Sequence, residues 1–269
     1  MARIWIYGDE SGTMPASDGD APFVAAFLVS RNAVADVGKR SRSVNWLVCN
    51  IRTLGLRPSI AYVKPRPGFA KTWAAKADLL ETMARARKLV TGRHDYLPQA
   101  GMPRRNHVWI RATQQALLQA TLNSLFVGPV VEVTLVLDRK TLADETERFM
   151  RDRVDALIPG VKDELLRLRS GHPEHAARID GYHENLQATG IKFEWGSPEK
   201  QAGLWLSHHL ARLAHRELMG QNEKSLFDAL TRAGHSNYCR DVTDSLLQPV
   251  TDEAVERWKR DTGLPVPKI

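Results

Sequence analysis

The chain opens with a strand-like run that ends in polar residues, IWIYGDESG at positions 4–12. Its first residues are apolar, aromatic or β-branched, which is typical of a buried strand. Asp9 and Glu10 follow directly, and a carboxylate at the end of a buried strand loses hydration energy unless a positive group lies beside it. A divalent cation is one such group, because hard cations prefer oxygen ligands. The stretch therefore predicts either a metal site or a polar turn, since turns are also rich in Asp, Ser and Gly.

A second strong strand pattern also ends in a carboxylate, because VVEVTLVL at residues 130–137 is followed by Asp138. Further strands are predicted over residues 22–30, 59–64 and 191–195. Between and after them, apolar residues at helical spacing predict helices over residues 32–54, 71–90, 106–126, 141–158, 161–168, 199–219, 224–232 and 251–261. Strands that alternate with helices in this way predict an α/β protein.

The opening IYGDESGT, with the apolar run PFVAAFLVS at residues 22–30 behind it, resembles the start of the DUF3800 family. The resemblance extends over residues 3–30, 130–142 and 191–212. It implies a ribonuclease H-like mixed central sheet of about five strands flanked by helices, in which the strands ending in Asp9 and Asp138 lie side by side. It also implies two Mg²⁺ or Mn²⁺ ions held by carboxylates, which activate water and stabilise the leaving oxygen in phosphodiester cleavage.

The chain departs from the family pattern at two places. Residues 204–211, LWLSHHLA, keep the hydrophobic frame of the family's last helix, but His208 stands where the family has an aspartate. The strand predicted over residues 59–64 also lacks the glutamate that the family usually carries there. His208 can ligate a metal or act as an acid or base near neutral pH. It can equally be a core histidine, and a site without its acids can bind without cleaving.

Glu10 is a further candidate metal ligand. Adjacent residues of a strand point to opposite faces, so Glu10 joins Asp9 only if the chain turns directly after Asp9. His172 and His175 have a spacing that zinc sites use, but no cysteine lies near them in the sequence. A solvated connecting loop is the preferred interpretation of that stretch.

Positive charge is concentrated in one segment of the chain. The net charge is +7, and residues 31–115 hold seventeen Lys or Arg against four Asp or Glu. This asymmetry predicts a polyanion partner, DNA or RNA, because phosphate contacts supply most nonspecific nucleic-acid affinity. The other interpretation is a solvated, arginine-rich surface. The candidate nucleic-acid contacts are Lys64, Arg66, Arg87, Lys88, Arg93, Arg104 and Arg105.

The length of 269 residues suits one large domain with additions. We expect a ribonuclease H-like domain over residues 1–220, with a basic helical insertion at about 65–126, and a helical C-terminal extension over 221–269. No run of eighteen apolar residues occurs, so no membrane span is predicted. The two cysteines, Cys49 and Cys239, are isolated and no signal-peptide pattern opens the chain, so we expect a cytoplasmic protein.

Together these features favour a metal-dependent nuclease that uses Mg²⁺ or Mn²⁺. Asp9, Glu10, Asp138 and His208 are its candidate metal ligands, and Asp9, Asp138 and His208 its candidate catalytic residues. One alternative is a nucleic-acid-binding protein with a degenerate site, which the missing family acids favour. The other is a component of a mobile-element or defence complex, in which the apolar helix predicted over 106–126 docks a protein partner or a second copy of the chain.

Overall fold

The computed structural model of the chain describes residues 2–12, 20–38, 40–91, 116–118, 129–138, 144–222, 224–235, 238–244 and 252–267. These residues build a six-stranded sheet with the strand order β5-β4-β1-β2-β3-β6. The strands have the bounds β1 Ala2–Ser11, β2 Phe23–Ser30, β3 Arg57–Val63, β4 Val130–Asp138, β5 Ile191–Gly196 and β6 Cys239–Asp241.

The sheet is mixed, because both parallel and antiparallel pairs occur in it. β2 lies antiparallel between β1 and β3. β4 is parallel to β1 and to β5, and β6 is parallel to β3. This confirms the α/β class and the expected place of the first strand beside the strand that ends in Asp138. β6 adds a short edge strand from the C-terminal part of the chain, where no apolar run predicts one.

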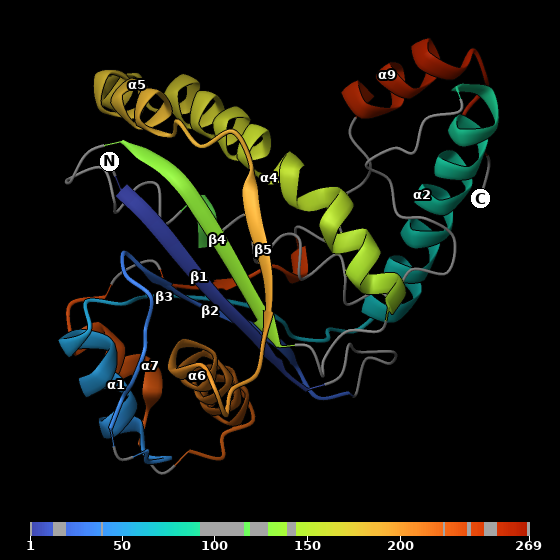
Figure 1. Cartoon of the computed structure of the whole chain (residues 1–269). Coiled ribbons are helices and arrows are strands. Elements are labelled where there is room, and N and C mark those ends of the chain that lie inside the picture. Colours follow the sequence, from blue (N-terminus) through green and yellow to red (C-terminus); the bar gives the residue numbers. More distant parts are fainter. Residues whose placement is uncertain are drawn as a thin grey trace.

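Helices cover both faces of the sheet, and Figure 1 shows α1, α6 and α7 on one face and α4 and α5 on the other. α2 packs against α9, where the indole N–H of Trp258 donates to the Met83 carbonyl at 2.9 Å. No helix in the described part of the chain is long and apolar enough to cross a membrane. The helices and one 3-10 turn, η3, have the bounds α1 Val44–Thr53, α2 Phe69–Thr91, α4 Asp144–Gly171, η3 Pro173–His175, α5 Ala176–Asn185, α6 Ala202–Leu218, α7 Leu226–Arg232 and α9 Asp252–Thr262.

Three predicted segments differ from the structure. The helix predicted over 32–54 begins only at Val44, where the Ser43 hydroxyl accepts the Trp46 N–H and caps the first turn. The two helices predicted over 141–158 and 161–168 are one helix, α4, which contains Pro159. The predicted loop around His172 and His175 instead holds η3 and α5, because Ile179 and Tyr182 bury one helical face. Of the helix predicted over 106–126, only residues 116–118 are described, and they are helical and buried.

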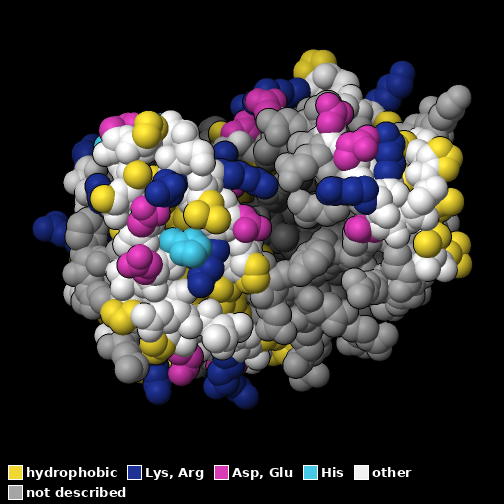
Figure 2. All heavy atoms as spheres, turned by 90° about the horizontal axis from the view of Figure 1, so that it is seen from above, with side chains coloured by type: hydrophobic (Ala, Val, Ile, Leu, Met, Phe, Trp, Pro, Cys, Tyr) yellow, Lys and Arg dark blue, Asp and Glu magenta, His cyan; other side chains and the backbone are white. Residues whose placement is uncertain are grey.

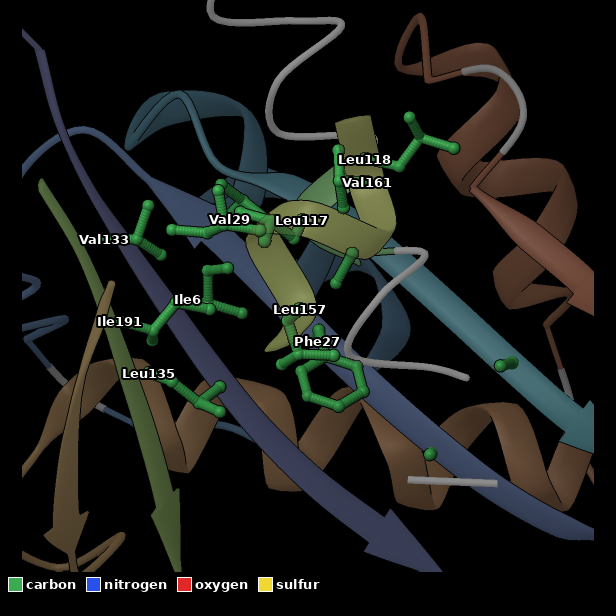
Figure 3. Packing of buried hydrophobic residues seen from close by; sticks show 14 of the residues in the cluster. Ile6, Phe27, Val29, Leu117, Leu118, Val133, Leu135, Leu157, Val161 and Ile191 are labelled. Carbon is green, nitrogen blue, oxygen red and sulfur yellow. The ribbon is translucent and has the colours of Figure 1, made fainter. Parts of the chain in front are cut away.

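Side chains alternate between two apolar cores, one on each face of the sheet. Ile4 and Ile6 of β1 point to the core under α4 and α5. Tyr7 points to the core under α1, α6 and α7. Figure 3 shows the first core, in which strand residues pack against α4 and the 116–118 helix: Ile6, Phe27, Val29, Val133, Leu135, Ile191, Leu117, Leu118, Leu157 and Val161.

A glycine in α6 sets how this helix lies on β1. A Cβ on Gly203 would lie 2.6 Å from ring atoms of Tyr7, so the helix backbone lies directly on that ring. The Tyr7 hydroxyl is fixed in turn, because it accepts the Val34 N–H at 2.9 Å. This contact holds the register of α6 over the end of β1, and it brings His208, five residues further along, to that end of the strand.

Candidate functional site

Asp9 and Asp138 lie at the same edge of the sheet. β1 and β4 are parallel, and their register pairs Gly8 with Leu137, so the next residue in each strand is an aspartate. Both aspartates point to the face that α6 covers, because Tyr7 and Val136 pack there and strand side chains alternate. Asp9 is 3% exposed and Asp138 is 9% exposed. Two buried carboxylates from strands about 4.8 Å apart therefore meet at one place.

His208 on α6 contacts the first of these carboxylates. Its Nδ1 lies 2.9 Å from Oδ2 of Asp9, while Oδ1 of Asp9 accepts the Glu10 N–H at 2.7 Å. The hydrogen bond with Asp9 raises the pKa of His208, burial opposes this, and the nearby Asp138 charge adds to the increase. The His208 side chain is 49% exposed, so it is not a core histidine.

Glu10 is not brought to this cluster. The expected turn after Asp9 is absent: β1 continues through Ser11, and Glu10 and Ser11 pair with Ala25 and Val24 of β2. Glu10 therefore lies on the opposite face of the strand from Asp9. β1 ends at Ser11, and the following Gly12 has a φ of +89° and packs against Pro22 and His215.

The two aspartates are the part of the predicted metal site that the structure brings together. Among the described residues, no three His, Cys, Asp or Glu side chains form a group that could hold a metal ion. Magnesium is commonly bound by one or two carboxylates, with waters and substrate phosphates completing its shell. The buried pair Asp9 and Asp138 fits an ion of this kind, whereas Nδ1 of His208 is already bonded to Asp9.

The histidines considered for zinc are both exposed and both face one carboxylate. Nδ1 of His172 lies 3.4 Å and Nε2 of His175 lies 3.8 Å from Oε1 of Glu174. All three are described residues, and they do not form a group that could hold a metal ion. This cluster is therefore a surface feature of η3.

His209, next to His208, is the core histidine of α6. It is 3% exposed, and its Nε2 has no hydrogen-bond partner among the described residues. Burial lowers the pKa of His209 to about 4, although the ring also bonds to the Arg42 carbonyl, which favours the charged form. The pKa values of the two adjacent histidines thus shift in opposite directions, because His208 faces a carboxylate and His209 faces the core.

We expect His209 to make the protein sensitive to acid. Its pKa is lower in the folded protein than the unfolded value of about 6.5, so its contribution to stability falls as pH drops from about 6.5 to about 4. At pH 5 the loss is about 2 kcal/mol. His209→Asn keeps an N–H donor but does not titrate, so its free energy of unfolding in urea should fall less between pH 7.5 and pH 5 than that of the wild type. Equal losses in both proteins would contradict this assignment.

Arg66 forms ion pairs that the sequence does not predict, and its role as a nucleic-acid contact stays a prediction. Its guanidinium lies 2.7 Å from Asp244 and 3.2 Å from Asp241, so two carboxylates neutralise its charge and join the end of β3 to β6. Lys64 remains available as a contact because its side chain is exposed. β3 runs parallel to β1, since both are antiparallel to β2, so Lys64 and Asp9 lie at the same edge of the sheet.

The other predicted contacts are not placed by the structure. Arg87 and Lys88 belong to α2, but their side chains are outside the described set. Arg93, Arg104 and Arg105 lie outside the described residues. Their role in binding stays a prediction.

The face formed by α4, α5 and α9 carries both signs of charge. Figure 2 shows acidic and basic side chains interspersed over it. Some are paired, such as Arg169 with Asp180 at 2.7 Å and Lys259 with Glu256 at 2.6 Å. The described residues of this face therefore form no uniformly positive surface for a nucleic acid.

Cations that the sequence analysis did not single out lie on the opposite face, along α6. Arg212 and Arg216 follow His208 at intervals of four residues, so the three share one side of the helix. Arg212 lowers the pKa of His208 by its charge, which places the two groups near each other. The spacing of four residues between His208, Arg212 and Arg216 is visible in the sequence, and it could have identified these arginines as neighbours of His208 on one side of the helix.

Comparisons with known proteins add little to this picture. No family model matches the chain, and no curated protein matches it. Among solved structures, the chain is similar to LC9-RNase H1, described as a type 1 RNase H with the type 2 active-site motif. The two chains are 12% identical with a TM-score of 0.31, over 89% of this chain and 87% of the other. The fold class rests on the strand order, and the function must be argued from the site.

Proposed function

We propose that Asp9, Asp138 and His208 form the site of a nuclease that cleaves phosphodiester bonds with Mg²⁺ or Mn²⁺. The observation that carries this proposal is the pair of buried carboxylates at adjacent parallel strand ends. Burying a carboxylate is unfavourable unless it has charged or hydrogen-bonding partners, and such groups gather at functional sites. The half-exposed His208, which is hydrogen-bonded to Asp9, adds a proton donor or acceptor that is in contact with solvent.

The residues divide the chemistry between them. Asp9 and Asp138 would hold the divalent ion, which when bound activates water and stabilises the leaving oxygen. In the metal-free protein, the hydrogen bond with Asp9 raises the pKa of His208 and so favours a proton on the ring at this place. A protonated histidine beside the scissile bond can donate that proton to the leaving oxygen. Asp9 also orients the ring through its 2.9 Å hydrogen bond.

Nucleic acid is the proposed substrate because cations surround this edge. Lys64 lies at the same edge of the sheet, and Arg212 lies beside His208. Both can neutralise backbone phosphates without reading the bases. The motif IYGDESGT and the strand order also support a place for the chain in the DUF3800 family, which remains part of this proposal.

A second candidate is a protein that binds nucleic acid at the same place without cleaving it, alone or within a mobile-element or defence complex. It is favoured by the finding that no three metal-ligating side chains converge in the described part of the chain. Nucleases of the two-metal type hold their ions with several carboxylates. The two candidates share the cations of α6 and differ only in chemistry.

A cleavage assay separates the two candidates. The purified protein is incubated with labelled single-stranded DNA, duplex DNA, RNA and an RNA–DNA hybrid, in Mg²⁺, Mn²⁺ or EDTA. We expect cleavage of at least one substrate with a divalent ion and none in EDTA. An Asp138→Asn protein prepared in parallel controls for contaminating nucleases. Binding in EDTA with no cleavage under either metal would reject the nuclease and leave the binding protein.

A further inference from the structure

A cavity of about 320 Å³ lies on the α6 side of the sheet, where the start of α1 meets the later turns of α6. Figure 1 shows α1, α6 and α7 together on this side. Polar and basic side chains dominate the lining, which includes Arg42, Ser43, Asn45, Arg216, Asn222 and Lys224. Arg216 shares one side of α6 with His208, and the other residues of the lining have no role in the site proposed above.

Three cations from separate segments converge on this cavity. Arg42 precedes α1, Arg216 belongs to α6 and Lys224 precedes α7. Among the described residues, the eight that line the cavity include no aspartate or glutamate. Cations that converge in this way repel one another, and an anion bound between them removes the repulsion.

The carboxylate of Glu217, the neighbour of Arg216 in α6, is bonded into the junction of α6 with α7. Its Oε1 accepts the Ser225 hydroxyl at 2.5 Å, and its Oε2 accepts the Leu226 N–H at 2.7 Å and the Asn222 side-chain amide at 3.1 Å. Arg216 donates to the Gln221 carbonyl at 3.1 Å. These bonds hold Asn222 beside Arg216 and tie the start of α7 to the end of α6.

The start of α1 adds hydrogen-bond donors to the same wall. The Ser43 hydroxyl accepts the Trp46 N–H at 3.3 Å. Val44 and Asn45 line the cavity, and the first N–H groups of a helix have no acceptor within the helix. Three cations together with such donors suit a tetrahedral oxyanion, and phosphate is the common biological one.

The cavity lies in line with the candidate catalytic edge. His208, Arg212 and Arg216 follow one another on one side of α6 at intervals of four residues. The eight residues from His208 to Arg216 span about 12 Å of helix. This is the length of about three to four stacked nucleotides at 3.4 Å each. A strand at Asp9 and His208 thus reaches the cavity by running along α6.

We propose that Arg42, Arg216 and Lys224 bind a backbone phosphate of the nucleic acid, three to four nucleotides from the bond at Asp9 and His208. The identity of this polyanion rests on the function proposed above. The cavity has the chemistry of a phosphate site. Its phosphate group could come from a nucleic-acid backbone, or instead from free phosphate or a phosphorylated small molecule.

Binding of labelled single-stranded and duplex oligonucleotides, measured by fluorescence anisotropy in EDTA, tests this proposal without any cleavage. The variant is Arg42→Gln/Lys224→Gln, which keeps the Arg42 carbonyl that His209 uses. We expect its affinity to fall at least about tenfold on every sequence. The slope of log affinity against log salt should fall by about 0.7–0.9, the value for one phosphate. The control is Arg167→Ala, which replaces an exposed arginine of α4 on the other face of the sheet. It should change neither the affinity nor the salt slope.

Inorganic phosphate, titrated calorimetrically into the wild type and the variant, separates the two sources. Phosphate binding that the variant loses, together with the loss of oligonucleotide affinity, supports the proposal. Loss of phosphate binding with unchanged oligonucleotide affinity assigns the cavity to a small phosphorylated ligand and overturns the proposal. Unchanged oligonucleotide affinity and unchanged salt slope overturn it as well. If the wild type cleaves nothing but the variant still loses affinity, the nuclease fails and the phosphate site stands.

Discussion

Asp9→Asn and Asp138→Asn are each expected to lower the rate of phosphodiester cleavage by roughly a thousandfold. Each change is nearly isosteric, and it removes one of the two negative charges that would hold the divalent ion. The rate is measured with a labelled oligonucleotide at saturating Mn²⁺. Nucleic-acid affinity should stay within a few fold of the wild type, because the phosphate contacts are made by other residues.

The matched control for these variants is Asp163→Asn, which removes the same charge from an exposed position of α4 on the other face of the sheet. It should cleave at the wild-type rate. If Asp9→Asn and Asp138→Asn cleave as fast as this control, the carboxylate pair is not the catalytic site.

His208→Gln is expected to lower cleavage by about a hundredfold or more, the usual contribution of a general acid or base. It should also change how metal-free stability depends on pH. The pKa of His208 is raised in the folded protein, so its stabilising contribution is complete below about pH 6.5 and is lost as pH rises through the folded value. The melting temperature of metal-free His208→Gln should therefore lie below that of the wild type at pH 5.5, and the gap should narrow at pH 8.5.

The stability effect will be small, because half of the His208 side chain is exposed and solvent screens its charge. The control is His183→Gln on α5, a histidine away from both aspartates. A gap between wild type and His208→Gln that is the same at both pH values would mean that the contact with Asp9 carries no charge. Full cleavage activity in His208→Gln would assign the histidine a structural role.

The aspartate pair was predictable because each strand is a run of apolar residues in the sequence that is followed directly by an aspartate. Parallel pairing then brings Asp9 and Asp138 to one edge, and the family resemblance supplied that pairing. His208 was predictable from the hydrophobic frame around it. The neighbouring His209 has the same residue type, and only the helix geometry shows which of the two faces the core.

The surroundings of Arg66 and Glu10 could not be predicted, because both depend on residues that are distant in the sequence. Arg66 is neutralised by Asp241 and Asp244, more than 170 positions away. Glu10 fails as a ligand because β1 runs two residues past Asp9, which pairing with β2 decides. Neither the carboxylate partners of Arg66 nor the length of β1 beyond Asp9 can be read from composition or local sequence pattern.

The cavity lined by Arg42, Arg216 and Lys224 could not be predicted from the sequence for the same reason. Arg42 and Lys224 come together only because α1 and α7 pack on α6. The charge asymmetry of the sequence pointed to residues 31–115 as a whole, and it gave no weight to the cations of α6. Those cations lie in the part of the chain that is acidic on balance.

The aspartate variants also test the metal site independently of activity. In metal-free protein, Asp9→Asn loses the charge attraction between Asp9 and a protonated His208, so its melting temperature falls at acidic pH. At pH 8, where the ring carries less charge, relief of repulsion between the two carboxylates offsets that loss. Asp138→Asn leaves the contact between His208 and Asp9 in place.

The most direct test of the central claim is the melting temperature at pH 8 with and without Mn²⁺, for the wild type and Asp138→Asn. If Asp9 and Asp138 hold the ion, Mn²⁺ at a hundredfold excess over its Kd stabilises the wild type by about 2.7 kcal/mol. The account predicts that this rise in melting temperature is largely lost in Asp138→Asn. A variant that melts lower than the wild type and keeps the full response to Mn²⁺ would contradict it.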